Sequence, residues 1–372
     1  YGPIASQLVS LQLVTTGGQV IQLEPHDGMT DPAQFPGYIE SGGERITATL
    51  QQDDEAFNAV VVSMGCMGVI YAAVLRAVPR FWLREVRELT TWGDLTKAGG
   101  FLQRLLTKQR LEPHEAQDPD HYEIYFNPYP PARGKPASSH SCLLTKRYRL
   151  AEEPAHLSQD ARRRGSWGSD LIGTVVAVTG RGNAVVDYLN AHPQAVPRSL
   201  DDALAALQDK SYIDLSYNVF NLGPANLFRA YGIEMAFDLA QIVKVTERHF
   251  AIAADLREHG VMHVSPPSIR FVASSDAHLA MMYGRQTAML EIGMLVGVSG
   301  ADQLLKTYER KYIDEFAARP HWGLDLQILQ DFSEVKALYP AAERWHQQYQ
   351  RFNARGTFNG ELTDRLGISI AT

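Results

Sequence analysis

Cysteine and basic residues are scarce in this chain of 372 residues. The two cysteines, Cys66 and Cys142, lie far apart and belong to no C-x-x-C or ligand-like cluster, which excludes a disulfide framework and a thiolate zinc site. Lys and Arg total 35 against 42 Asp and Glu, which gives a formal net charge of −7. Because binding to nucleic acid requires a basic face that neutralises phosphates, we expect no nucleic-acid partner.

Several catalytic motifs are also missing. The sequence has no Walker A lysine motif, H-E-x-x-H pair, G-x-S-x-G elbow or EF-hand loop, so the common NTPase, zinc-protease and hydrolase classes are excluded. Gly180 and Gly182 lack the third glycine of a dinucleotide fingerprint. His249, His259 and His263 are irregularly spaced and lie near no carboxylate cluster, so we expect surface or helix-capping histidines and no metal site.

Long hydrophobic runs are rare, and one of them raises the question of a membrane span. Residues 59–75 read A-V-V-V-S-M-G-C-M-G-V-I-Y-A-A-V-L without a charge. Gly65 and Gly68 are poor helix formers, and the flanks are rich in β-branched residues. A buried strand, a glycine turn and a second buried strand or helix start fit this run better. We therefore expect no integral membrane span and a cytoplasmic location.

Hydrophobic periodicity predicts a mixture of strands and helices. Residues 1–24 alternate apolar and polar side chains around Gly17 and Gly18, which predicts a hairpin. Further strands are expected at 71–88 (interrupted by Pro79), 121–127, 231–239, 268–273 and 287–296, and helices at 53–62, 93–110, 200–207, 242–256, 304–317 and 341–349. Residues 128–170, rich in Pro, Ser, Arg and Glu, are expected to form a loop. The elements do not follow a tight β-α-β rhythm, which favours an α+β fold.

The most informative local pattern is the glycine turn, defined as residues 63–70 (S-M-G-C-M-G-V-I). Its glycines, Gly65 and Gly68, are three residues apart. Glycines so placed let backbone N–H groups approach a phosphate or the edge of a flavin ring closely. By itself the pattern indicates a structural turn equally well.

Longer segments resemble a known family. Residues 53–79 resemble the flavin-contacting turn of FAD-linked oxidases of the vanillyl-alcohol oxidase superfamily, and R-P-H-W-G at 319–323 resembles the R-P-H-W-G-K signature of their sugar-lactone and alditol oxidase branch. Four more segments resemble that branch's M-E-Y, E-x-R-F, D-D-x-x-L-S-x-x-Y-G-R-D-T and G-x-F-x-N motifs in the same order, at 233–235, 268–272, 276–287 and 356–359. The resemblance thus extends over nearly the whole chain.

The resemblance implies a fold and a domain organisation. We expect the second half of an FAD-binding domain at 1–86, an α+β substrate-binding cap with an antiparallel sheet at 87–317, and a segment that folds back toward the flavin at 318–372. The pyrophosphate-binding loop and T-H-G-T-G stretch that such flavoproteins carry upstream do not occur. A missing N-terminal FAD half-domain is therefore expected as a partner of this chain.

The resemblance also assigns expected roles to individual residues. The residues implied to bind FAD are Ser6, Gln7, Ser63, Gly65, Gly68, Val69, Ile70 and His321, those implied to bind substrate are Ser268, Arg270 and Leu324, and those implied to be catalytic are Arg270, His321 and Glu234. Two positions depart from the branch: Ser268 replaces the acidic residue of E-x-R, and Leu324 replaces the lysine after H-W-G. These departures favour a substrate that is less polar or bulkier than a free alditol.

The chemistry explains why such residue types are expected. Oxidation of an alcohol requires its C–H carbon close to flavin N5, a group that accepts the hydroxyl proton, and positive charge near the N1–O2 edge of the flavin. Arg270 is suited to orient the hydroxyl and supply charge, His321 to act as a base and Glu234 to bind hydroxyl groups. Each also has a structural interpretation: an ion pair for Arg270 and Glu234, and packing beside Trp322 for His321.

Together these features predict an FAD-dependent oxidoreductase. The expected reaction is oxidation of a CH–OH group of a sugar-like or larger hydroxylated small molecule by hydride transfer to flavin N5, with oxygen or another acceptor reoxidising the flavin. The competing hypothesis is a non-catalytic or split-flavoenzyme fragment that acts as a binding or structural partner, which the missing half-domain and the two lost charges favour. Anaerobic bleaching of the flavin by substrate distinguishes the two.

Overall fold

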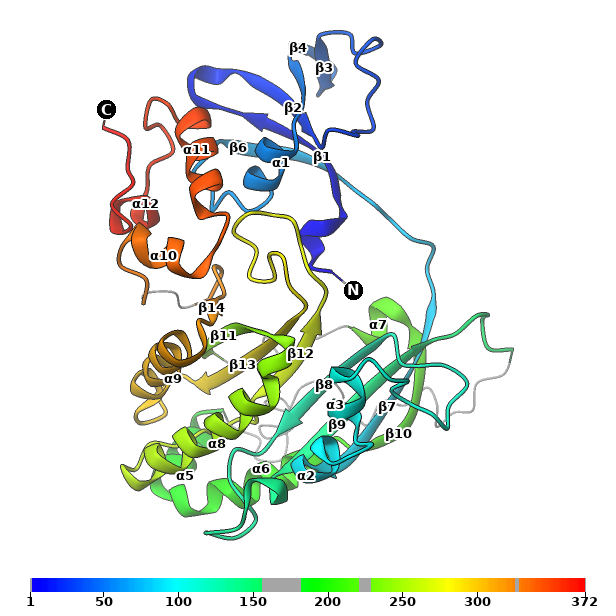
Figure 1. Ribbon diagram of the computed structural model, residues 1–372, viewed down its shortest axis with the longest axis vertical. Coiled ribbons are helices and arrows are strands. Elements are labelled where there is room, and N and C mark those ends of the chain that lie inside the picture. Colours follow the sequence, from blue (N-terminus) through cyan, green and yellow to red (C-terminus); the bar gives the residue numbers. More distant parts are fainter. Residues whose placement is uncertain (1, 156–181, 221–228, 325–327, 372) are drawn as a thin grey trace. The chain divides into compact units, whose positions relative to one another are not determined.

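The computed structural model describes residues 2–155, 182–220, 229–324 and 328–371. Contacts within the chain divide it into two compact units that exchange segments along the sequence. Unit 1 consists of Pro79–Phe271 and Thr287–Asp325, and unit 2 consists of Gly2–Val78, Val272–Gln286 and Leu326–Thr372. Each unit combines helices with antiparallel strands, which confirms the α+β expectation (Figure 1).

Unit 2 contains a four-stranded sheet with the strand order β5-β2-β1-β6. The predicted N-terminal hairpin is confirmed: β1 and β2 are antiparallel, with Leu11 opposite Leu23, and Gly17 adopts a φ of 80° in the connection. Its elements are η1 (Ile4–Gln7), β1 (Leu8–Val14), η2 (Thr16–Gly18), β2 (Val20–Glu24), β3 (Tyr38–Ser41), β4 (Glu44–Thr47), β5 (Thr49–Gln52), α1 (Asp54–Val60), β6 (Val69–Leu75), α10 (Phe332–Leu338), α11 (Ala342–Phe352) and α12 (Glu361–Arg365).

The uncharged run at 59–75 divides between a helix end, the glycine turn and strand β6. Helix α1 begins after Asp53, whose side chain accepts hydrogen bonds from the backbone N–H groups of Glu55 and Ala56. The helix packs on α11, where the indole of Trp345 donates to the Val62 carbonyl at 2.9 Å. The expectation that the second strand of this run is buried is wrong, because β6 ends the sheet and most of its side chains are exposed.

Unit 1 contains an eight-stranded sheet with the strand order β10-β7-β9-β8-β12-β13-β11-β14. Its elements are β7 (Trp82–Thr91), α2 (Trp92–Thr96), α3 (Phe101–Leu106), β8 (His121–Phe126), η3 (Ala137–Ser139), β9 (Ser141–Arg149), α5 (Gly182–Ala191), η4 (Pro193–Ala195), α6 (Val196–Ala206), β10 (Asp209–Leu215), α7 (Ser216–Val219), β11 (Ala230–Asp238), η6 (Leu239–Gln241), α8 (Ile242–Glu258), β12 (Ser268–Val272), β13 (Thr287–Leu295), α9 (Ala301–Phe316) and β14 (Arg319–Pro320). The strands predicted near 121–127, 231–239, 268–273 and 287–296 are confirmed.

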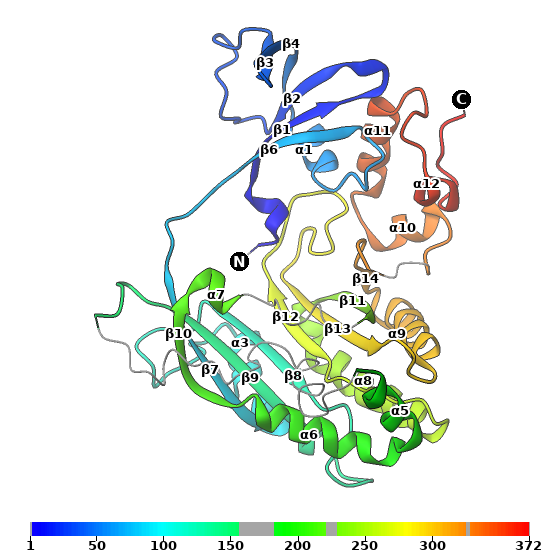
Figure 2. The ribbon, with the colours of Figure 1, turned by 180° about the vertical axis from the view of Figure 1, so that it is seen from behind.

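The two faces of this sheet differ in chemistry, because successive residues of a strand point to opposite sides. One face packs on α8 and α9, which lie side by side (Figures 1 and 2), and forms the main core of unit 1. Aromatic rings fill that core edge to face: Trp92 meets Phe250 at a centroid distance of 5.7 Å, and Phe237 meets Tyr312 at 5.0 Å. The opposite face carries most of the charged residues described below.

Two local expectations in unit 1 are wrong. The helix expected at 93–110 is two short helices, α2 and α3, because Gly99 adopts a φ of +74° between them, and a Cβ at Gly100 would lie 2.4 Å from the Asp94 carbonyl oxygen. The loop expected at 128–170 contains β9, an internal strand of the sheet. Its successive charges, Lys146 and Arg147, obscure the alternation of apolar residues. Residues 156–170 of that expected loop lie outside the described residues.

The expectation of surface histidines is also wrong for two of the three positions. His249 and His263 are fully buried in the core of unit 1, where His249 Nδ1 lies 2.6 Å from the Tyr312 hydroxyl and His263 Nε2 lies 2.8 Å from that of Tyr308. His259 is exposed at the end of α8. Among the described residues there is no group of His, Cys, Asp and Glu side chains arranged to hold a metal ion.

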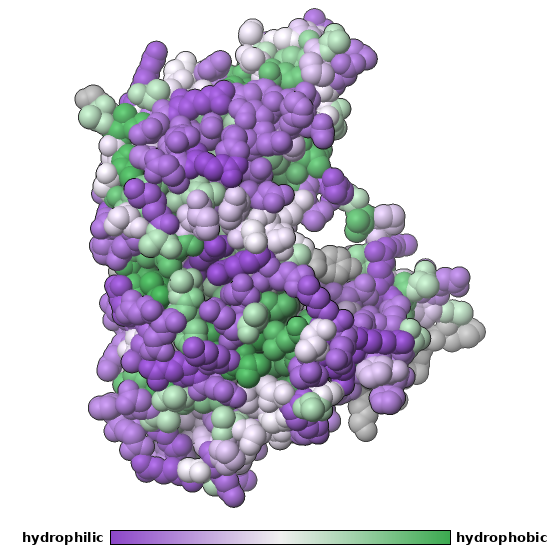
Figure 3. Space-filling view, viewed as in Figure 1, coloured by the Kyte–Doolittle hydropathy of each residue, from purple (hydrophilic) through white to green (hydrophobic). Residues whose placement is uncertain are grey.

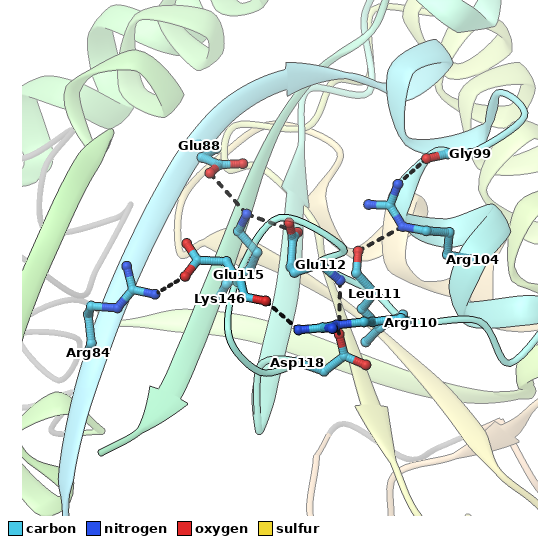
Figure 4. Close-up of polar contacts among 10 residues, drawn as sticks. All are labelled: Arg84, Glu88, Gly99, Arg104, Arg110, Leu111, Glu112, Glu115, Asp118 and Lys146. Atoms are coloured by element: carbon cyan, nitrogen blue, oxygen red, sulfur yellow. Dashed lines mark hydrogen bonds and ion pairs between the residues drawn. The ribbon is translucent and has the colours of Figure 1, made fainter. Parts of the chain in front are cut away.

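Residues 107–120 are tied to β7 and β9 on the core side of the sheet (Figure 4). Arg84 contacts Glu115 at 2.8 Å, and the buried Lys146 bridges Glu88 at 2.9 Å and Glu112 at 3.0 Å. On the face drawn in Figure 3 hydrophilic residues predominate, and hydrophobic residues gather in separate patches between them. In the described part of the chain, no helix combines the length and the hydropathy that crossing a membrane requires.

Candidate active site

Strand β12 places Ser268 and Arg270 on the charged face of the unit 1 sheet. Ile269 lies between them and is fully buried in the core on the other side. The register pairs Ser268 with Tyr125 and Arg270 with Glu123 on strand β8. The alternation that buries Ile269 thus brings two of the predicted substrate-binding residues to one face.

Arg270 binds two carboxylates. Its guanidinium forms an ion pair with Glu234 at 3.3 Å and a second, closer ion pair with Glu291. The hydroxyl of Ser268 donates to Glu291 Oε2 at 3.2 Å. We call these four residues, Glu234, Ser268, Arg270 and Glu291, the carboxylate–arginine cluster.

The two glutamates of the cluster lie directly opposite each other. In the antiparallel register of β11 and β13, Glu234 pairs with Glu291. Like charges at such a pair are unfavourable, because opposing side chains are only about 5 Å apart at Cβ. Arg270 offsets this repulsion by binding both. Perturbed carboxylates of this kind are found at functional sites and also in structural ion-pair networks.

Burial and charge shift the proton equilibria of the cluster. Burial raises the pKa of Glu234 to about 7, Arg270 opposes that shift and Glu291 adds to it. The Arg270 guanidinium has a raised pKa, because its carboxylate partners outweigh the effect of burial. At neutral pH the Glu234 carboxyl is therefore able both to accept and to release a proton.

His321 lies beside the cluster. Its backbone N–H donates to the Glu234 carbonyl at 2.9 Å, and its ring Nδ1 accepts from the Gly323 N–H at 3.0 Å. In the neutral ring this leaves the proton on Nε2. Burial lowers the pKa of His321, an effect that Glu291 opposes and Arg270 increases. The structure thus brings Glu234, Ser268, Arg270 and His321 together. Leu324, which comes shortly after His321 in the chain, has an exposed side chain.

The cluster is the accessible end of a longer row of alternating charges on the same face. Arg147 on β9 contacts Glu85 at 2.6 Å and Glu123 at 3.4 Å, and Arg87 contacts Glu85 at 2.9 Å. Although burial raises it, the pKa of Glu123 is held low by Arg147 and Arg270. Opposite charges therefore continue across neighbouring strands from the buried part of the face to Arg270.

Glu291 and Glu123 lie outside the motif positions that predict site residues. Glu291 lies at the centre of T-A-M-L-E-I-G-M-L, where one acidic residue interrupts an apolar strand. Such an interruption marks a charge at the edge of an apolar core, but nothing local relates it to Arg270, which lies on another strand. Their proximity becomes apparent only from the order β12-β13-β11 in the sheet.

The remaining predicted residues belong to unit 2. Ser63 is buried, whereas Gly65, Val69 and Ile70 are exposed. Gly65 has a φ of +74° and open space where a Cβ would lie. Gly68 has a φ of +144° and contacts β1, since a Cβ there would lie 2.6 Å from the Val14 carbonyl oxygen. Gly65 therefore leaves open space at the surface of the turn, and Gly68 allows the turn to pack closely against β1.

Ser6 and Gln7 lie in the 3-10 helix η1, directly before β1. The Gln7 carbonyl accepts a hydrogen bond from the Arg76 N–H at 2.7 Å, which ties η1 to the residue that follows β6. Both predicted residues thus lie at the same end of the β1–β6 pair. The glycine turn lies at the other end, where Val14 pairs with Val69.

Strand β6 presents an apolar surface next to the glycine turn. Five apolar side chains of this strand are exposed: Val69, Ile70, Tyr71, Val74 and Leu75. Within the described residues β6 is the last strand of the unit 2 sheet and pairs only with β1. An exposed apolar strand beside an open glycine turn offers both stacking surface and backbone hydrogen bonds.

Comparison with known proteins gives a consistent result. A model of the D-arabinono-1,4-lactone oxidase family matches residues 118–366, two thirds of the chain. An L-gulono-1,4-lactone dehydrogenase of Mycobacterium tuberculosis (strain CDC 1551 / Oshkosh) is 22% identical over 364 residues, which cover 98% of this chain and 69% of that protein.

Solved structures of two cholesterol oxidases share the fold. A solvent-stable cholesterol oxidase matches with a TM-score of 0.63 and 16% identity, over 99% of this chain and 70% of its own. The cholesterol oxidase from B. sterolicum matches with a TM-score of 0.61 and 13% identity, over 98% of this chain and 70% of its own. At these identities the likeness concerns the fold alone.

Proposed function

The chain belongs to the D-arabinono-1,4-lactone oxidase family, and on that basis we propose that it oxidises a CH–OH group of a sugar-like hydroxylated small molecule at the carboxylate–arginine cluster. The family consists of FAD-linked oxidases and dehydrogenases that act on CH–OH groups, and FAD is the cofactor. This membership confirms the resemblance to the sugar-lactone branch of the vanillyl-alcohol oxidase superfamily. It also favours an enzyme over a non-catalytic binding partner.

The observation that carries the proposal is the position of Arg270 between two carboxylates on neighbouring strands. A hydroxyl group both donates and accepts hydrogen bonds, and this cluster offers both kinds of partner. The guanidinium donates to the hydroxyl oxygen, and a carboxylate accepts the hydroxyl hydrogen. Arg270 therefore orients the hydroxyl that is to be oxidised.

Removal of the hydroxyl proton is assigned to Glu234. Its pKa of about 7 suits a base that must accept a proton at neutral pH, and its side chain is 12% exposed, so bulk water contributes little competing solvation. His321, whose backbone N–H binds the Glu234 carbonyl, is the second candidate base. As the proton leaves the oxygen, the substrate carbon loses hydride and the C=O bond forms.

FAD, when bound, supplies at N5 the acceptor for that hydride. The residues proposed to hold it are Ser6 and Gln7 in η1, together with the glycine turn at 63–70 in unit 2. Their part is to bind and orient the ring system and to keep water from its face.

Product analysis with defined substrates tests this proposal. FAD-loaded protein is incubated with D-arabinono-1,4-lactone or L-gulono-1,4-lactone and a reducible dye, and the product is identified by mass spectrometry. The proposal predicts dye reduction and a product that lacks two hydrogens. Protein that binds FAD and both lactones but forms no oxidised product would contradict it.

A further inference from the structure

The charged face of the unit 1 sheet carries one more carboxylate than guanidinium in the row that ends at the cluster. Arg87, Arg147 and Arg270 face four glutamates in this row: Glu85, Glu123, Glu234 and Glu291. In the buried part, each carboxylate has a guanidinium beside it. At the open end Arg270 is shared by Glu234 and Glu291, so the two glutamates have one cation between them.

Accessibility separates these two glutamates. The side chains of Arg270 and Glu291 are each 38% exposed, whereas that of Glu234 is 12% exposed. A molecule that reaches the row from solvent therefore meets the Arg270–Glu291 pair. Glu234 lies behind this pair, in the position of a proton acceptor rather than of a recognition group.

Ser268 fixes the Glu291 carboxylate in this exposed position. Its hydroxyl donates to Glu291 Oε2 at 3.2 Å. Ser268 also occupies the position, two residues before Arg270, at which the resemblance leads us to expect an acidic side chain. The short serine side chain leaves room for the carboxylate of Glu291 to reach Arg270 from the adjacent strand β13.

From these contacts we infer that Glu291 is a substrate-binding residue that replaces the carboxylate absent at Ser268 and binds a second hydroxyl, next to the one that is oxidised. The inference rests on the proposed function. The Arg270 guanidinium donates to one oxygen of a vicinal diol, while the Glu291 carboxylate accepts from the neighbouring hydroxyl. The substrate class is accordingly a polyhydroxylated molecule, such as a sugar lactone, and not an alcohol with a single hydroxyl. The carboxylate that is absent at position 268 is supplied by Glu291 on strand β13. Of the two departures that favoured a less polar substrate, Ser268 and Leu324, only Leu324 then remains.

The test combines Glu291→Gln with analogues of the substrate. Binding of L-gulono-1,4-lactone, and of analogues that each lack one hydroxyl, is measured by calorimetry on the FAD-loaded full chain, and kcat/KM is measured in parallel. Glu291→Gln should weaken binding of the parent lactone about 10- to 100-fold, the range expected for a lost hydrogen bond to a charged group. It should change little for the one analogue that lacks the contacted hydroxyl.

Two further variants serve as rescue and control. The exchange S268E/E291S returns the carboxylate to strand β12 and should recover most of the lost affinity. Glu88→Gln is the matched control, because Glu88 lies on the core side of the same sheet and pairs with Lys146 (Figure 4). It should bind every analogue as the wild type does.

The possible outcomes separate the inference from the proposed function. Binding that depends on Glu291 without turnover would support the inference and contradict the proposed oxidation. If the wild type turns over the lactone, two results would overturn the inference alone. One is that Glu291→Gln binds the lactone as tightly as Glu88→Gln does. The other is that Glu291→Gln weakens the binding of every analogue equally. Absence of lactone binding by folded, FAD-loaded wild type would overturn both. If the exchange variant does not fold, the comparison of Glu291→Gln across the analogues decides the matter.

Discussion

At the scale of single residues, the proposed reaction depends on side chains whose pKa values are displaced. Glu234 is the main example, because burial raises its pKa to about 7. A base must be unprotonated to accept a proton, so activity is retained above that pKa and is lost as pH falls through it. We expect kcat/KM to fall about tenfold per pH unit on the acid side.

The variant Glu234→Gln tests this role. Loss of a general base should lower kcat by at least about 100-fold and remove the acid limb from the pH profile, while FAD and lactone still bind. The measurement is kcat and KM from pH 5 to pH 9 for the wild type and the variant. An unchanged acid limb in the variant would show that another group, with His321 the first candidate, accepts the proton.

Because two histidines are buried in the core of unit 1, we expect the free energy of unfolding to depend on pH. Burial lowers the pKa of His263 to about 3, and the pKa of His249 is also strongly lowered by burial, with smaller contributions from His263 and His140. The unfolded chain therefore binds more protons than the folded chain below about pH 6.5. Above about pH 6.5 the two buried histidines make their full contribution to the free energy of unfolding. This contribution is lost as pH falls toward the lowered pKa values that these histidines have in the folded protein.

We expect each buried histidine to reduce the free energy of unfolding by up to about 1.4 kcal/mol per pH unit below pH 6.5. Denaturant titrations between pH 7 and pH 4.5 measure this slope. His263→Gln should flatten it, whereas His259→Gln at the exposed end of α8 should leave it unchanged. Equal slopes for all three proteins would refute this explanation.

At the scale of elements, the glycine turn shows how two similar residues serve different purposes. Gly68→Ala would place a Cβ 2.6 Å from the Val14 carbonyl oxygen at a φ of +144°, whereas Gly65→Ala would add a Cβ to open space at a φ of +74°. We expect losses of about 3 and about 1 kcal/mol in the free energy of unfolding, respectively. Denaturant titration measures both. Equal losses would mean that packing against β1 is not what fixes the turn.

The charged row connects strands β7, β9, β8, β12, β13 and β11, and Arg147 lies in its buried part. Removing one partner of a buried ion pair leaves an uncompensated charge, so Arg147→Met should reduce the free energy of unfolding by about 3 kcal/mol. The matched control is Arg198→Met, since Arg198 forms an exposed pair with Asp202 at 3.8 Å and should show no measurable change. Similar values for the two variants would show that the row contributes little to stability.

The elements that could be predicted from sequence are those with a clear local period. The hairpin around Gly17 and the strand at 287–296 belong to this group. Strand β9 was missed because Lys146 and Arg147 look like surface charges in the sequence. They are buried, and each is paired with glutamates that are distant in the chain.

At the scale of the whole molecule, the sequence motifs predicted the family and the fold class, and they contain three residues of the candidate site. Glu234, Arg270 and His321 fall in such segments, and the structure brings them together. Glu291 could not be assigned, because its partner Arg270 lies on a different strand, separated by the Val272–Gln286 segment of unit 2. Local sequence carries no record of which strands become neighbours in a sheet.

The central claim, that this chain oxidises a hydroxylated small molecule with FAD, is tested most directly by an anaerobic reduction. FAD-loaded protein is titrated with L-gulono-1,4-lactone in the absence of oxygen while the visible absorption band of the flavin is recorded. The account predicts that the band is lost in proportion to the lactone added, with one lactone oxidised per flavin, and that Glu234→Gln slows this loss. A bound flavin that stays fully oxidised in saturating lactone would contradict the account.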